Sequence, residues 1–201
     1  MKIGPRYKKA RYLGVPVFRK TQTQKFSIRS QRKAKNIRRR GNKSEYGQQM
    51  MEKQRARYSY GVSGKQFTSY VKKALKIAGD NGKNLLHLLE SRLDNVIVRS
   101  GFAPTRSAAR QMVSHGHITV DGIIVNVPSY SVSIGETLSI RPGSRQKVLF
   151  SKLEENLEHM TRPNWLSVDL GKKEIRIEST PDVTPEELLF NVQSVLEFYT
   201  R

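Results

Sequence analysis

Residues 90–126 read ESRLDNVIVRSGFAPTRSAARQMVSHGHITVDGIIVN, and this stretch decides the fold. Leucine, valine and isoleucine recur three and four residues apart through its first part, which predicts an amphipathic helix over residues 84–100. Gly101 follows at a position where a left-handed glycine commonly ends a helix. The stretch is therefore expected to begin with a helix that buries one apolar face.

A second helix is expected after a short break. Pro104 disfavours a continuous helix, Thr105 is suited to an N-cap, and a thin apolar stripe continues until Gly116. The side chains left for the outer face of this helix are polar or cationic, namely Arg106, Arg110, Gln111, Ser114 and His115.

A β-hairpin completes the stretch. Asp121-Gly122 is a strong signal for a tight hairpin turn, and β-branched residues alternate on both sides of it. Further alternating segments predict a third strand over residues 137–141 and a second hairpin over residues 164–178, with Trp165 in the core. Two helices and a small twisted sheet would form an α+β module.

Charge is distributed unevenly along the chain. The 201 residues carry a formal net charge of +20. Residues 1–43 hold 16 Lys and Arg and no acidic residue, whereas residues 152–201 hold 6 basic and 10 acidic residues. A surplus of cations of this kind indicates a polyanionic partner. We therefore expect a basic arm, a basic body and a structural C-terminal segment.

Residues 1–43 show neither helical nor strand periodicity, so we expect an extended basic arm that becomes ordered only on its polyanion. Aromatic residues lie among the cations of this arm, a mixture suited to neutralising phosphates and stacking on unpaired RNA bases. These aromatic residues are Tyr7, Tyr12, Phe18 and Phe26. A solvated tail or a nuclear-localisation run remains an alternative for this segment.

The remaining chain predicts two domains. Residues 44–88 should be mainly helical, with a capping box that begins at Ser63. A last helix is expected from the N-cap Thr184, followed by proline at the first helical position. We expect residues 179–201 to complete the helical domain and residues 89–178 to form the α+β module with its C-terminal hairpin.

The residue types present argue against catalysis and metal binding. Cysteine is absent, which excludes disulfides and thiolate metal sites. The sequence has no glycine-rich phosphate loop and no Ser, His and acid arrangement of a nucleophile site. His115 and His117 form a close histidine pair, but Asp121 is the only nearby acid. We expect no catalytic residue, no metal and no cofactor.

The hydrophobic pattern also bears on location. No apolar run reaches the roughly 20 residues that a membrane-spanning helix needs, and the first residues lack the apolar core of a signal peptide. We therefore expect an intracellular protein without a membrane partner.

Two long segments carry a resemblance to a known family. LESRLDNVIVRSGFAPTRSAARQMVSHGHITVDGIIVNVPSY, residues 89–130, resembles the RNA-binding module named after the small-ribosomal-subunit protein S-four. SEYGQQMMEKQRARYSYGVSGKQF, residues 44–67, resembles the helical domain of the bacterial and organellar S-four proteins themselves. Gly4-Pro5-Arg6 and Pro163-Asn164-Trp165-Leu166 fit the same family in the same order. The module alone also occurs in RNA-modifying enzymes and in one class of aminoacyl-tRNA synthetases.

The chain departs from the family pattern at its basic arm. Many members have a turn with proline, glycine and histidine before the helical domain, where this chain has KNIRRRGN at residues 35–42. Some members carry zinc-binding cysteines in the arm, and this chain has none. The segments GPRYKKARYLG and EFYTR look more like plastid members, which favours a ribosome in a plastid stroma over one in a bacterial cytoplasm.

The resemblance implies a structural constituent of the small ribosomal subunit. Such a protein binds small-subunit rRNA at a helix junction of the 5′ domain and nucleates assembly. It neighbours ribosomal protein S-five, lies near the channel through which mRNA enters, and contributes to translational accuracy. The residues that we expect to contact rRNA are Arg6, Lys8, Lys9, Arg11, Arg38, Arg39, Arg40, Lys53, Arg55, Arg57, Arg92, Arg106, Arg110, Gln111, Ser114, His115, His117 and Asn126.

Two other classes of protein are compatible with part of this pattern. An RNA-modifying enzyme such as a pseudouridine synthase uses the same module for docking, but it needs a separate catalytic domain on the order of a hundred residues. The module here is flanked by residues 1–88 and 152–201, and the first 43 residues contain no side-chain carboxylate. A DNA-binding or nucleoid protein without sequence preference fits the charge but not the resemblance.

Overall fold

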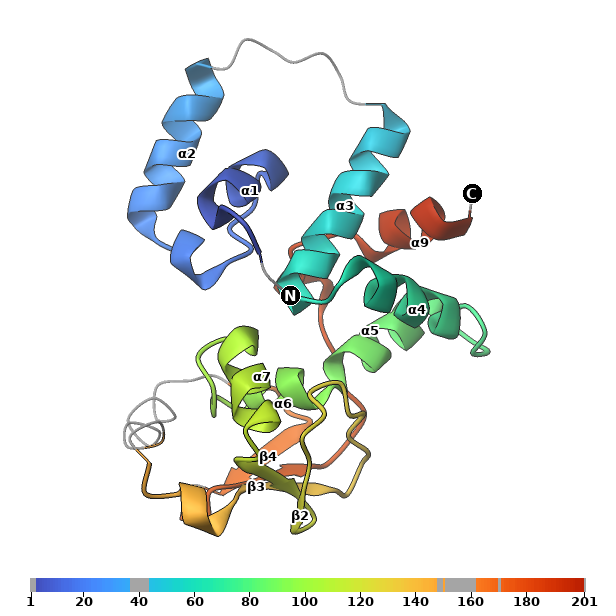
Figure 1. Ribbon diagram of the computed structural model, residues 1–201. Coiled ribbons are helices and arrows are strands. Elements are labelled where there is room, and N and C mark those ends of the chain that lie inside the picture. Colours follow the sequence, from blue (N-terminus) through green and yellow to red (C-terminus); the bar gives the residue numbers. More distant parts are fainter. Residues whose placement is uncertain (1–2, 37–43, 148–149, 151–161, 170, 201) are drawn as a thin grey trace. The chain divides into compact units, whose positions relative to one another are not determined.

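The computed structural model describes residues 3–36, 44–147, 150, 162–169 and 171–200 (Figure 1). It divides into two compact units. One unit, Met1–Leu85 with Val183–Arg201, is helical, and we call it the helical unit. The other, Leu86–Asp182, contains the β-sheet, and we call it the sheet unit. The architecture is α+β, as predicted from the sequence.

The helical unit is assembled from both ends of the chain. Its elements are α1 (Arg6–Leu13), the 3-10 turn η1 (Arg19–Thr21), α2 (Gln24–Asn36), α3 (Glu45–Tyr60), α4 (Gly64–Ala74), η4 (Pro185–Glu187) and α9 (Val192–Thr200). The helix α5 (Asn81–Glu90) begins in this unit and ends in the sheet unit. Among the described helices, none has the length and apolarity of a membrane-spanning segment.

Two helices in the first 36 residues correct the prediction of an extended arm. Leu13 at the end of α1 is buried, and Phe18 meets the ring of Tyr58 on α3 edge-on, with 5.8 Å between ring centroids. Arg55 of α3 donates from Nε and Nη2 to the carbonyl oxygen of Leu13, at 2.9 and 2.6 Å. The prediction was wrong because average composition hides a few apolar residues that are buried in the tertiary structure.

The C-terminal helix begins later than predicted. Residues after Thr184 form only the short η4 turn, and α9 starts at Val192. Asn191 takes the capping role, since its Oδ1 accepts from the amide of Ser194 at 3.0 Å. The amide of Asn191 donates in turn to the carboxylate of Glu52 on α3, at 2.8 Å. A partner on another helix, which local sequence cannot reveal, therefore helps to place the start of α9.

The sheet unit packs two helices against a small antiparallel sheet. The helices are α6 (Leu93–Arg99) and α7 (Arg106–Ser114). The strands β1 (Ile118–Val120), β2 (Ile123–Ile124), β3 (Thr137–Ile140), β4 (Leu166–Asp169) and β5 (Glu174–Ile177) pair in the order β2-β1-β3-β5-β4. The 3-10 turn η2 (Pro142–Ser144) follows β3. The shared core includes Leu93, Ile97, Met112, Val113, Ile118, Leu138, Ile140 and Ile175.

Local signals around the module are confirmed. Thr105 caps α7, because its hydroxyl accepts from the amide of Ala108 at 3.2 Å. Asp121 and Gly122 both have positive φ, 47° and 82°, as a tight hairpin turn of the primed type requires. Trp165 is buried at 3% exposure, as expected of a core residue. The cap and the turn concern neighbouring residues, so no distant contact was needed to interpret them.

The helix predicted over residues 84–100 is instead two helices. Ser91 and Arg92 separate α5 from α6. The amide of Leu93 donates to the carbonyl of Tyr130 at 2.8 Å, and the amide of Val132 donates to the carbonyl of Ser91 at 2.8 Å. The apolar spacing continues across the break, but the backbone there is hydrogen-bonded to the loop after the hairpin rather than within a helix.

A buried carboxylate stabilises this break. Glu90 is 0% exposed and accepts from Nε and Nη2 of Arg99, at 3.0 and 2.9 Å. The side-chain amide of Asn95 donates to the same carboxylate and to the carbonyl oxygen of Glu90. The end of α5 is thus joined to α6 by charge-assisted hydrogen bonds, which are stronger than neutral ones.

We predict that Phe18→Ala lowers the free energy of unfolding by about 3 kcal/mol without any RNA present, since it removes a buried aromatic ring. Urea unfolding followed by circular dichroism measures this. Ile28→Ala on α2 is the control, because Ile28 is 49% exposed and its truncation should change stability by less than about 0.5 kcal/mol. Equal effects of the two substitutions would mean that the first 36 residues are not folded in the free protein.

We predict that Glu90→Ala lowers the free energy of unfolding by about 3 kcal/mol. The substitution leaves the buried amide of Asn95 and the guanidinium of Arg99 without their carboxylate. Glu90→Gln keeps an oxygen acceptor and should cost less. Glu178→Ala removes an exposed acid of the same unit and serves as the reference. The measurement is again urea unfolding, and a cost for Glu90→Ala no larger than that for Glu178→Ala would contradict the structural role of this carboxylate.

Candidate nucleic-acid interface

The outer side of α7 presents the polar set that the sequence predicted. Ala109, Met112 and Val113 are buried in the core of the sheet unit, which leaves the opposite side of the helix at the surface. We call that side the α7 surface and define it by Arg106, Arg110, Gln111, Ser114 and His115. Its last three residues are exposed, and the two arginines are half-buried.

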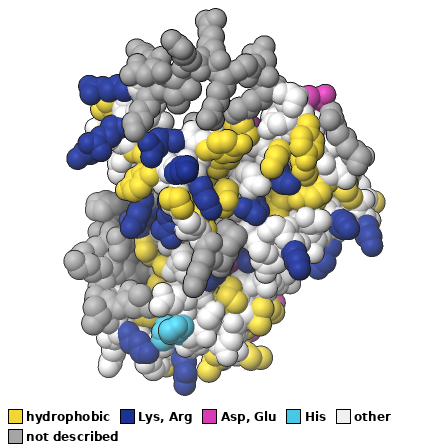
Figure 2. Space-filling view, turned by 45° about the horizontal axis from the view of Figure 1, so that its top comes forward, with side chains coloured by type: hydrophobic (Ala, Val, Ile, Leu, Met, Phe, Trp, Pro, Cys, Tyr) yellow, Lys and Arg dark blue, Asp and Glu magenta, His cyan; other side chains and the backbone are white. Residues whose placement is uncertain are grey.

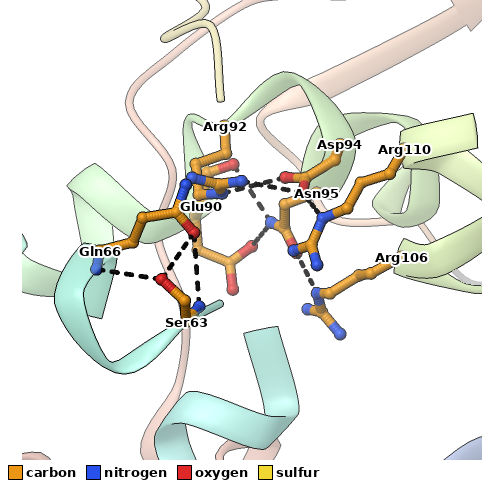
Figure 3. A network of polar contacts seen from close by, with 8 residues as sticks. All are labelled: Ser63, Gln66, Glu90, Arg92, Asp94, Asn95, Arg106 and Arg110. Carbon is orange, nitrogen blue, oxygen red and sulfur yellow. Dashed lines mark hydrogen bonds and ion pairs between the residues drawn. The ribbon is translucent and has the colours of Figure 1, made fainter. Parts of the chain in front are cut away.

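Arg110 is held by a buried acid on α6. Asp94 is 1% exposed, and Arg110 donates from Nε to its Oδ2 (Figure 3). Arg92 donates from Nε and Nη2 to the two carboxylate oxygens of the same Asp94, at 3.0 and 2.9 Å. Two guanidinium groups compensate the cost of burying this carboxylate. Asp94 is therefore a structural acceptor.

Arg106 is held in a similar way. Its Nε donates to Oδ1 of Asn95 at 2.8 Å, and the amide nitrogen of Asn95 donates to the carboxylate of Glu90 (Figure 3). Both arginines of the α7 surface are thus oriented through Nε by partners on or before α6. Three arginines bind the two carboxylates, Glu90 and Asp94, and Arg106 binds Asn95, so these contacts together keep a net positive charge.

Arg92 requires a correction. It was predicted to contact rRNA, but the residue is 3% exposed and its guanidinium is bidentate on Asp94. A buried side chain cannot reach a phosphate without breaking an ion pair in a medium where charges are costly to separate. We therefore assign Arg92 a structural role.

A second group of predicted residues lies at the end of α7. His117 accepts from or donates to the hydroxyl of Ser144 through Nδ1, at 3.0 Å. Burial lowers the pKa of His117, and the nearby charges of Lys147, His115 and Arg141 lower it further. Asn126 is exposed, and its side-chain oxygen lies near Gly116, 3.2 Å from where a Cβ would be.

Arg141 and Lys147 were missed by the sequence analysis. Both are exposed, and the amide of Arg141 donates to the carbonyl of His117 at 2.9 Å. Pairing between β1 and β3 brings this segment to the end of α7. Their charge was visible in the sequence, but their proximity to His117 depends on the register of the sheet.

The predicted cations of α1 are at the surface of the helical unit. Arg6, Lys8 and Arg11 are exposed. Lys9 is half-buried and places Nζ 5.0 Å from the ring centroid of Tyr58. Figure 2 shows Lys and Arg side chains across the face that it presents, many of them beside hydrophobic side chains.

The predicted cations of α3 are partly engaged within the protein. Lys53 lies over the ring of Phe198, with Nζ 3.8 Å from its centroid, and burial followed by the charge of Arg57 lowers its pKa. Arg57 lies 4.5 Å from the ring centroid of Tyr58, and Arg55 binds the carbonyl of Leu13. These three cations therefore stabilise the helical unit in addition to any contact with RNA.

The remaining predictions concern the run of three arginines in the basic arm and the question of metal binding. Arg38, Arg39 and Arg40 lie outside the described residues. Within the described ranges, no group of three or more His, Asp or Glu side chains is arranged to hold a metal ion. His115 and His117 have ring centroids 6.0 Å apart.

Two family models match different parts of the chain. Residues 91–138 match the model of the S4 domain, and residues 1–90 match the model of the ribosomal protein S4/S9 N-terminal domain. The small ribosomal subunit protein uS4 of Roseiflexus castenholzii is 46% identical over 160 residues, which cover 79% of this chain and 78% of the relative.

A second relative extends the match over nearly the full length. The small ribosomal subunit protein uS4 of Mycobacterium ulcerans is 41% identical over 198 residues, which cover 98% of each chain. The two matched family models together span the helices of the N-terminal half and the α7 surface. On these grounds the chain belongs to the uS4 family of small-ribosomal-subunit proteins.

Proposed function

We propose that this chain is a non-enzymatic, structural constituent of the small ribosomal subunit that binds its rRNA. The observation that carries the proposal is the α7 surface, where Arg106 and Arg110 are held in place by Asn95 and buried Asp94. Guanidinium groups neutralise phosphates, while exposed Gln111 and Ser114 supply hydrogen bonds that position a backbone. Preorganised side chains lose less conformational entropy on binding than mobile ones.

The chemistry of the sheet unit favours binding over catalysis. Glu90 and Asp94 are its buried carboxylates among the described residues, and both are ion-paired to arginine. A carboxylate whose oxygens are held by fixed donors inside the protein serves as a structural acceptor and is not placed to take a proton from a substrate. The proposal of an RNA-modifying enzyme therefore finds no support at this site.

The finer part of the proposal concerns the place in the ribosome. We expect the rRNA site to be a helix junction of the 5′ domain, bound early so that it nucleates assembly. The expected neighbours are ribosomal protein S-five and mRNA near the channel through which it enters, with an effect on translational accuracy. The family resemblance supports these expectations, and segments that look plastid-like favour a plastid stroma over a bacterial cytoplasm.

The first prediction of this proposal is selective binding. Purified full-length protein should bind the isolated 5′ domain of small-subunit rRNA at least about tenfold more tightly than a structured RNA of equal length, at 150 mM salt, by filter binding. Charge alone would bind both RNAs equally well, because phosphate contacts carry no sequence information. Equal affinities would therefore contradict the proposed function.

The second prediction concerns the charges of the α7 surface. The double substitution Arg106→Gln with Arg110→Gln should reduce the slope of log K against log salt by about two, one for each lost phosphate contact. Arg176→Gln, which removes an exposed cation of the same unit from β5, should leave that slope nearly unchanged.

A further control in this experiment is His117→Gln. Because burial and neighbouring cations lower the pKa of His117, the ring is neutral at neutral pH and its removal should not alter the slope. A slope change for Arg176→Gln as large as that for the α7 arginines would place the interface elsewhere.

A further inference from the structure

An open cleft of about 570 Å³ lies in the helical unit, beside α1 and the start of α2. Among the described residues that line it, none is acidic or aliphatic. They comprise two aromatic rings, three cations and two hydroxyls: Tyr7, Phe26, Arg11, Lys25, Arg29, Thr23 and Ser30. Arg11 is among the predicted site residues, and Tyr7 and Phe26 are among the aromatic residues of the basic arm, but only the structure brings these side chains together in one cleft.

The two rings form a single aromatic wall. Tyr7 and Phe26 have centroids 5.8 Å apart with planes inclined by 40°, so they pack against each other. Tyr7 nevertheless keeps 49% of its surface exposed, and Phe26 is half-buried. This exposed aromatic surface is accessible to a ligand, and covering it would contribute favourable burial.

The cations lie at the surface around this wall. Arg11, Lys25 and Arg29 are all exposed, and Nε of Arg11 donates to the carbonyl of Tyr7 at 3.2 Å. That bond holds Arg11 against the backbone of Tyr7, whose ring forms part of the wall. A ligand on the rings would therefore have positive charge close to it.

These side chains match the chemistry of an unpaired nucleotide. A base stacks on an aromatic ring for about 1–3 kcal/mol, and the adjoining phosphates are neutralised by Lys and Arg. Hydroxyls such as those of Thr23 and Ser30 can bond a base edge or a ribose 2′-hydroxyl. A regular duplex or an acidic peptide would use the cations but leave the rings uncovered. The cleft volume also falls within the range of about 300–1,000 Å³ found for small-ligand sites.

We propose that the cleft of Tyr7, Arg11, Lys25, Phe26 and Arg29 binds an unpaired nucleotide of the rRNA, with its base on the rings and its phosphates on the cations. The inference rests on the proposed rRNA-binding function and adds a base-stacking site to it. The site lies in the helical unit, so it is a second point of contact besides the α7 surface.

The test uses the full-length protein and the 5′ domain of small-subunit rRNA. Tyr7→Leu with Phe26→Leu should weaken binding about tenfold, as the loss of one stacked base requires. The salt slope should stay unchanged, because no charge is removed. The aromatic pair Tyr7→Phe with Phe26→Tyr should restore affinity, since stacking needs only a ring.

Tyr46→Leu is the matched control. Tyr46 is 54% exposed and packs on Phe198 with centroids 5.4 Å apart, so it resembles Tyr7 in exposure and ring contact, but it does not line the cleft. Its substitution should leave affinity within about twofold of the parent protein. Thermal unfolding checks that each variant is folded. If the double variant does not fold, the single substitution Tyr7→Leu decides the question.

A second readout locates the nucleotide. Rings of Tyr7 or Phe26 should cross-link to rRNA substituted with 4-thiouridine, at a nucleotide that is unpaired in the 5′ domain. If the parent protein prefers this rRNA while Tyr7→Leu with Phe26→Leu binds like Tyr46→Leu, the cleft site is refuted and the proposed function stands. If the parent protein shows no preference for the rRNA, both are refuted. Cross-links confined to paired nucleotides would also overturn the cleft site.

Discussion

The geometry of the α7 surface depends on the ion pairs that the buried carboxylate of Asp94 forms. Burying a charge in the core of the sheet unit is costly unless partners are close, and Arg92 and Arg110 both donate to it. Arg92 is buried beside Asp94 and forms an ion pair with it, whereas Arg110 reaches Asp94 from α7. One buried acid thereby connects α6 to α7 and holds a cation of the α7 surface in place.

In the helical unit, too, cations are held by partners within the protein. Several of its cations have internal partners: Arg55 binds the carbonyl of Leu13, and Lys53 covers the ring of Phe198. The formal charge of +20 is therefore not simply a count of RNA contacts. Cations without such a role in the structure, like exposed Arg6 and Lys8, are better suited to the long-range attraction that brings a polyanion to the protein.

Much of the local structure was predictable because its causes lie within a few residues. Ser63 and Gln66 form the expected capping box, Thr105 caps α7, and Asp121-Gly122 makes the hairpin turn. The residues of each feature themselves supply the capping side chain or the backbone freedom that the feature needs. The apolar spacing of α7 likewise predicted which face is buried, and with it the exposed position of Gln111.

The sequence by itself determined the α+β class, the caps and turns, the basic character and the family. The tertiary structure decided which residues hold the site together. It divided the predicted helix at Ser91, buried Arg92 on Asp94, started α9 at Val192 with Asn191 as its cap, and formed α1 and α2 within residues 3–36. Each of these outcomes depends on a partner distant in sequence, such as the carbonyl of Tyr130 or the carboxylate of Glu52. Periodicity and composition describe neighbours along the chain, so they carry no information about such partners.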